Sequence, residues 1–215
     1  MSGLRCELTP FVLLGVLGGC ASSPGLDLAT NERLFRPPNY QVKIAADRPV
    51  TILPVVDARG PLLPDGATRS AVVEYMPESL WVRSIPEMLG DVVQESLTRS
   101  RVFAEALPGI HAEACLLRIE ILDFHAALVE RVTGRNTFAS VRLGVRVHGP
   151  IMAGGERPVW FEQEFGDHQV SEVGMIPPAT PVLLGRATYR VIAQMLASLD
   201  QSNVARTGVP RESDR

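Results

Sequence analysis

The sequence contains few of the residues and motifs on which enzyme chemistry depends. Its 215 residues include three cysteines, four histidines and a single lysine, Lys43. It lacks a nucleophile elbow, a Walker loop, a dinucleotide-binding glycine pattern and a Cys-x-x-Cys pair. These motifs mark hydrolases, nucleotide-binding enzymes and many zinc sites. We therefore predict a protein that is not an enzyme, with no catalytic residues, no metal site and no cofactor.

Two isolated signals do not change this prediction. His111 and Glu113 match half of the zinc deaminase signature, but the Pro-Cys-x-x-Cys half is absent. Cys115 lies in an apolar context without a second cysteine nearby, and a lone cysteine of this kind usually behaves as a small hydrophobic residue. We expect it to be buried and inert.

Positive charge and long apolar runs are also scarce. The formal net charge is −3, which argues against a nucleic-acid partner because such proteins usually carry a basic face. The apolar run at residues 11–17 is shorter than the roughly 20 residues that a membrane-spanning helix needs. Its length instead fits the hydrophobic region of a signal peptide.

This run ends in Leu17-Gly18-Gly19-Cys20, which has the form of a bacterial lipobox. The two glycines let the segment lie extended in a peptidase groove, and Cys20 supplies the thiol that takes the diacylglycerol. We predict cleavage between Gly19 and Cys20, with acyl chains on Cys20 holding the protein on a membrane. The alternatives are an ordinary secretory signal with a chance cysteine, or a buried helix. Ala21 favours the periplasmic face of the outer membrane, because aspartate is the usual inner-membrane retention signal at that position.

Four segments follow from composition. Residues 1–19 are the predicted signal peptide, and residues 20–39 are the lipidated cysteine and a flexible tether with Pro, Gly and Ser punctuation. Residues 40–200 are predicted to form one periplasmic domain. Residues 201–215 are polar, without an apolar period, and are predicted to be a disordered tail. The oligomeric state is left open.

Periodicity within the domain predicts its elements. A β-branched run at residues 50–56 indicates a strand, with Pro54 favouring an edge or a bulge. Ser84 and Glu87 form a capping box at the start of an amphipathic helix that continues to about residue 97. Three alternating strands are predicted at residues 115–122, 140–147 and 159–165. A second amphipathic helix begins at Thr180-Pro181 and ends near residue 199.

The fold class that follows is α+β. We expect an antiparallel sheet of about four strands with two amphipathic helices packed on one face, in the order strand-helix-strand-strand-strand-helix. The other face then stays wet and carries a candidate docking face of Arg118, Glu120, Arg142 and Arg146. These charges could equally be no more than a solvated surface. A second candidate site lies in the loop region and consists of Asp57, Arg59 and Trp81.

Several of these features together resemble the auxiliary lipoproteins of bacterial ABC-type, MCE-associated lipid transport systems. The matching parts are the lipobox, the strand at residues 50–56, Arg69 with Val72-Val73, the block at residues 81–97, the Leu-x-Ile-x-Ile strand from Leu117 and the terminal helix. Related small outer-membrane lipoproteins, including those that assist lipopolysaccharide assembly, share this order of elements.

The resemblance implies a non-catalytic, lipid-anchored periplasmic protein that supports envelope lipid transport or outer-membrane assembly by docking a protein partner. Two alternatives stay open. One is a structural or regulatory envelope lipoprotein that binds peptidoglycan or a synthase. The other is a periplasmic hydrolase that uses Asp57 or a histidine.

The lipobox prediction can be tested by replacing Cys20 with serine. The Cys20→Ser protein should be uncleaved or soluble, because the cysteine thiol is the route to the lipid anchor. Metabolic labelling with a palmitate analogue should mark the wild-type protein and spare the variant. Equal labelling of both would contradict the lipobox prediction.

Overall fold

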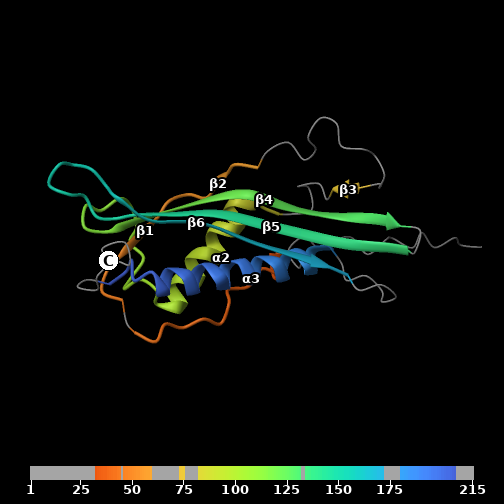
Figure 1. Ribbon diagram of the computed structural model, residues 1–215, viewed down its shortest axis with the longest axis horizontal. Coiled ribbons are helices and arrows are strands. Elements are labelled where there is room, and N and C mark those ends of the chain that lie inside the picture. Colours follow the sequence, from red (N-terminus) through yellow and green to blue (C-terminus); the bar gives the residue numbers. More distant parts are fainter. Residues whose placement is uncertain are drawn as a thin grey trace, which may run out of the picture.

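The computed structural model describes residues 32–44, 46–59, 73–75, 82–131, 134–171 and 180–206. The predicted α+β class is confirmed (Figure 1). The elements in chain order are β1 (Val50–Ile52), β2 (Val56–Asp57), β3 (Val73–Tyr75), α2 (Ile85–Ser100), β4 (Cys115–Arg131), β5 (Gly134–His148), β6 (Val159–Val170) and α3 (Thr180–Gln201). The predicted lipobox, Cys20 and Trp81 lie outside the described residues, as do residues 207–215 of the predicted tail.

The sheet is mixed rather than purely antiparallel. Strands β4, β5 and β6 form an antiparallel meander, and β3 pairs antiparallel with β4. Strands β1 and β2, however, pair parallel with β4. The reason is the long connection between β2 and β4, which contains α2 and brings the chain back to its starting end, as parallel pairing requires. The single strand predicted at residues 50–56 is split in two around Pro54, which has no N–H to donate.

A β-bulge explains why β4 extends beyond the strand predicted at residues 115–122. Leu117, Ile119 and Ile121 are completely buried, as the alternation predicted. The register then shifts between Ile121 and Asp123, which inserts one extra residue. Before the bulge the odd-numbered residues of β4 face the core. Beyond it the even-numbered residues do, and Phe124 and Ala126 are buried.

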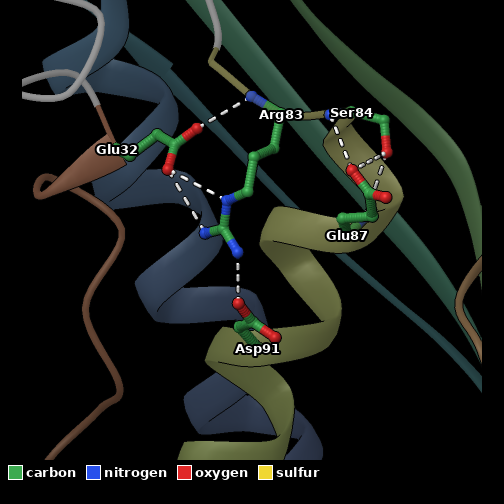
Figure 2. Close-up of polar contacts among 5 residues, drawn as sticks. All are labelled: Glu32, Arg83, Ser84, Glu87 and Asp91. Carbon is green, nitrogen blue, oxygen red and sulfur yellow. Dashed lines mark hydrogen bonds and ion pairs between the residues drawn. The ribbon is translucent and has the colours of Figure 1, made fainter.

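Helix α2 begins where the capping box predicted (Figure 2). The N–H of Glu87 donates to Ser84 Oγ, and the N–H of Ser84 donates to Glu87 Oε2 at 3.2 Å. Just before the cap, Arg83 contacts both Asp91 on α2 and Glu32 near the N-terminal end of the described chain, with 3.2 Å between Arg83 Nη2 and Glu32 Oε2. These contacts raise the pKa of Arg83, chiefly through the hydrogen bond to Asp91. The apolar stripe of the helix is buried as predicted: Ile85, Met88, Leu89, Val92, Val93 and Leu97.

Helix α3 lies against the apolar face of the sheet, on the same side as α2 (Figure 1). Its predicted stripe is fully or almost fully buried: Leu184, Ala187, Val191, Met195 and Leu199. Cys115 is buried in the same core, as predicted. The core is therefore one apolar layer between the sheet and two helices, which leaves the other face of β4, β5 and β6 polar.

The folded part begins before residue 40. Phe35 is buried in the core, with its ring centroid 5.9 Å from that of Phe124. The preceding residue, Leu34, lies directly on α3, because a Cβ on Gly185 would stand only 2.7 Å from the Leu34 carbonyl oxygen. Residues 34–39 therefore belong to the domain rather than to a flexible tether.

The folded part also continues past residue 200. Val204 and Ala205 are buried, and Arg206 pairs with Asp200 at the end of α3. Tyr40 donates a hydrogen bond of 2.8 Å to Asp200 Oδ2, which ties the segment before β1 to the end of α3. Burial and this hydrogen bond raise the pKa of Tyr40 to about 12. Residues 201–206 are thus part of the domain, not of a disordered tail.

Two substitutions in α2 should separate capping from burial. Ser84→Ala should lower the free energy of unfolding by about 1 kcal/mol, because it removes the cap. Val92→Asp should prevent stable folding, because it buries an unpaired carboxylate in the core. Denaturant unfolding followed by circular dichroism measures both effects. A Val92→Asp variant as stable as the wild type would show that this face of α2 is not packed.

Candidate functional site

The four residues of the predicted docking face lie together on the polar face of the sheet. Arg118 on β4 is paired in register with Arg146 on β5, and Glu120 with Gly144. Arg142 lies one step further along the same face of β5. Cross-strand neighbours of this kind lie close enough for their side chains to interact. The structure therefore brings the four residues together on one face of the sheet.

Strand β6 adds two residues that were not predicted to belong to the site. Glu162 is paired in register with Arg146, and Glu164 with Gly144. Both glutamates lie on the polar face of β6. They alternate with Phe161, Gln163 and Phe165, and this alternation was the available signal. The sequence does not state which residues of β5 they face, because that depends on the register of the hairpin.

The cluster forms three ion pairs, each between one arginine and one glutamate. Arg118 Nη2 lies 2.8 Å from Glu120 Oε1, Arg142 Nη1 lies 3.7 Å from Glu164 Oε2, and Arg146 contacts Glu162. The hydrogen bond from Arg146 lowers the pKa of Glu162. All six side chains are partly or largely exposed. Exposed pairs of this type contribute little to stability, so they do not account for the fold.

A hollow of about 290 Å³ lies in the middle of this charged face. Gly144 forms part of its lining, and the Leu122 side chain lies beside this glycine. A Cβ on Gly144 would stand 3.4 Å from Leu122 Cδ1, in van der Waals contact. Leu122 is the extra residue of the β-bulge, so the bulge supplies the apolar part of the hollow. Its lining comprises Arg118, Glu120, Leu122, Gly144, Val145, Arg146, Glu162, Gln163 and Glu164.

Further along the same face lies a cluster that the sequence analysis did not identify. The Ser140 hydroxyl donates to Asp123 Oδ2 at 2.6 Å, and His125 Nδ1 contacts Asp123 Oδ1. Burial disfavours ionisation of Asp123, but the hydrogen bonds from His125 and Ser140 outweigh it and lower its pKa. The serine hydroxyl thus points to the carboxylate and not to the imidazole. A serine nucleophile with a histidine base needs the other arrangement.

The candidate loop site is brought together only in part. Arg59 forms a bidentate ion pair with Asp57, in which Nε donates to Oδ1 at 2.8 Å and Nη2 donates to Oδ2 at 2.6 Å. It also donates to the Phe124 carbonyl at 3.4 Å. The hydrogen bond from Arg59 lowers the pKa of Asp57. This pair fastens the end of β2 to β4, and Trp81 lies outside the described residues.

In the part of the chain that the structure describes, no three His, Cys, Asp or Glu side chains gather closely enough to hold a metal ion. None of the described helices is both long and apolar enough to cross a membrane.

Comparison with known proteins finds similarity in structure alone. No family model and no curated protein matches the sequence. Among solved structures, protein XCC0632 from Xanthomonas campestris, described as DUF330, matches with 14% identity and a TM-score of 0.45, over 75% of this chain and 87% of that one. The hypothetical protein CT253 from Chlamydia trachomatis matches with 16% identity and a TM-score of 0.48, over 75% of this chain and 100% of that one.

Proposed function

We infer that this protein is a non-catalytic, lipid-anchored periplasmic protein that supports envelope lipid transport or outer-membrane assembly by docking a protein partner. Cys20 carries the anchor, and the outer membrane is the compartment that Ala21 favours. The docking surface is the polar face around Gly144. The observation that carries this proposal is the hollow beside Gly144, which is lined by two ion pairs and by Glu164 of the third.

The polar face suits a protein partner for two reasons. Its three arginines and three glutamates form three ion pairs, so a partner that carries both signs of charge can exchange pairs without leaving an isolated charge. Such complementarity favours specificity and fast association over raw affinity. The hollow at Gly144, with Leu122 at its side, can accept one protruding apolar side chain, which is the usual form of an interface anchor.

The arrangement of possible catalytic groups also favours docking over hydrolysis. The Asp57 carboxylate is held by Arg59, and Ser140 is bonded to Asp123. The Ser140 hydroxyl donates to a carboxylate whose pKa is lowered, and not to the imidazole of His125, so it lacks the histidine base of a serine hydrolase. A protein that acts through contact needs only a stable platform, and the core of α2 and α3 beneath the sheet supplies one.

A charge-reversal variant tests the docking proposal. The double variant Arg142→Glu and Arg146→Glu should fold and reach the membrane, because exposed substitutions usually change stability by less than about 0.5 kcal/mol. It should fail to restore the envelope barrier in a strain that lacks the gene. The measurement is growth in the presence of detergent, together with membrane fractionation and a thermal melt of the purified protein.

Two further variants make the result specific. Arg99→Glu with Arg101→Glu changes the net charge equally at the exposed end of α2, and it should complement the deletion normally. Exchanging the partners, as Arg146→Glu with Glu162→Arg, should restore the internal ion pair but not complementation. Full complementation by the Arg142/Arg146 double variant would show that the polar face is only a solvated surface.

A further inference from the structure

The outer side of α3 carries a groove that the docking proposal does not use. The groove has a volume of about 400 Å³ and lies between α3 and residues 34–39, on the side of α3 that faces away from the sheet. Its lining comprises Leu34, Arg36, Pro37, Asn39, Val182, Gly185, Arg186, Tyr189 and Arg190. It is thus an apolar trough with arginines along its rim.

The groove is fixed by specific contacts. Gly185 lets Leu34 lie directly on α3, because any side chain there would collide with the Leu34 carbonyl. A glycine inside a helix costs about 1 kcal/mol relative to alanine. The close packing of Leu34 on α3, which needs a glycine at position 185, offsets this cost. At the other end, the N–H of Asn39 donates to the Tyr189 hydroxyl at 3.5 Å. Phe35, between these two contacts, is buried in the core.

The rim carries an excess of positive charge. Arg36, Arg186 and Arg190 are all exposed. Among the described residues the acidic partner of these arginines is Asp167, whose Oδ1 lies 3.9 Å from Arg190 Nη1, at the limit of an ion pair. Between Thr180 and Leu199 helix α3 contains no aspartate or glutamate at all. This contrasts with the polar face of the sheet, where each arginine has a carboxylate close by.

We propose that this groove binds an anionic phospholipid, with the arginines on its phosphate and the acyl chain in the apolar trough. Guanidinium groups bind phosphate through paired hydrogen bonds. Leu34, Pro37 and Val182 offer an apolar surface that a free phosphate ion cannot use. The exposed Tyr189 has an apolar ring and a polar tip, which suits the boundary between headgroup and acyl chain.

The position of the groove in the chain also favours a membrane lipid. Leu34 follows Cys20 by 14 residues, so the groove can lie at most about 50 Å from an anchored cysteine. This step rests on the proposed lipidation of Cys20, whereas the argument from charge and shape does not. A lipid in this groove would draw the α3 side toward the bilayer and leave the polar face of the sheet open to a partner.

Photoaffinity labelling tests the proposal on the full chain. The purified protein in nonionic detergent is irradiated with phosphatidylglycerol that carries a diazirine on one acyl chain, and the labelled peptides are mapped. The label should concentrate in the peptides that contain residues 34–39 and 182–190. Phosphatidylcholine with the same acyl chains should label these peptides severalfold less, and inorganic phosphate should not compete.

Matched variants complete the test. Arg36→Glu with Arg186→Glu should reduce the groove label roughly tenfold or more, because each basic residue near an anionic lipid contributes about a factor of five. Arg36→Gln with Arg186→Gln serves the same purpose if the reversal harms folding. The docking variant, Arg142→Glu with Arg146→Glu, makes the same charge change on the opposite face and should label normally.

Three results would overturn the proposal. Label that maps elsewhere would place the lipid outside the groove. Equal labelling by the two lipids would remove the role of the arginines. Competition by inorganic phosphate would show an anion site without a lipid. None of these results bears on docking at the polar face, which is measured by complementation.

Discussion

Burial of one face of β4 and β5 under helix α3 is the interaction on which the rest of the structure depends. Leu117, Ile119 and Ile121 are removed completely from solvent, and each such side chain contributes roughly 1.5–3 kcal/mol. Because side chains alternate along a strand, the same packing forces Arg118 and Glu120 onto the opposite face. The polar face and its hollow are thus a direct consequence of the core.

Local signals carried most of what the sequence could predict. The start of α2 was predictable because Ser84 and Glu87 interact within one turn, and the buried stripes of both helices follow from spacing alone. Arg118, Glu120, Arg142 and Arg146 could be assigned to one face for the same reason. Alternation along a strand needs no knowledge of the rest of the chain.

What depends on distant contacts could not be predicted. Phe35 and the preceding Leu34 stand alone between charged residues and prolines, too short a pair to show a period, so the burial of Phe35 against Phe124 has no local signature. The parallel pairing of β1 depends on the path of the chain through α2. The bulge after Ile121 breaks the alternation of apolar and polar residues, so the sequence pattern predicted that the strand ends at residue 122. Glu162 and Glu164 joined the site only once the hairpin register was known.

The central claim, that the polar face around Gly144 contacts a partner, is tested most directly by site-specific photo-crosslinking in living cells. A photoreactive amino acid replaces Glu164 at the rim of the hollow and, as a control, Glu95 on the exposed side of α2; both side chains are largely exposed. The account predicts a discrete adduct of one mass from position 164 that is absent from position 95. No adduct from position 164, or the same adducts from both positions, would contradict it.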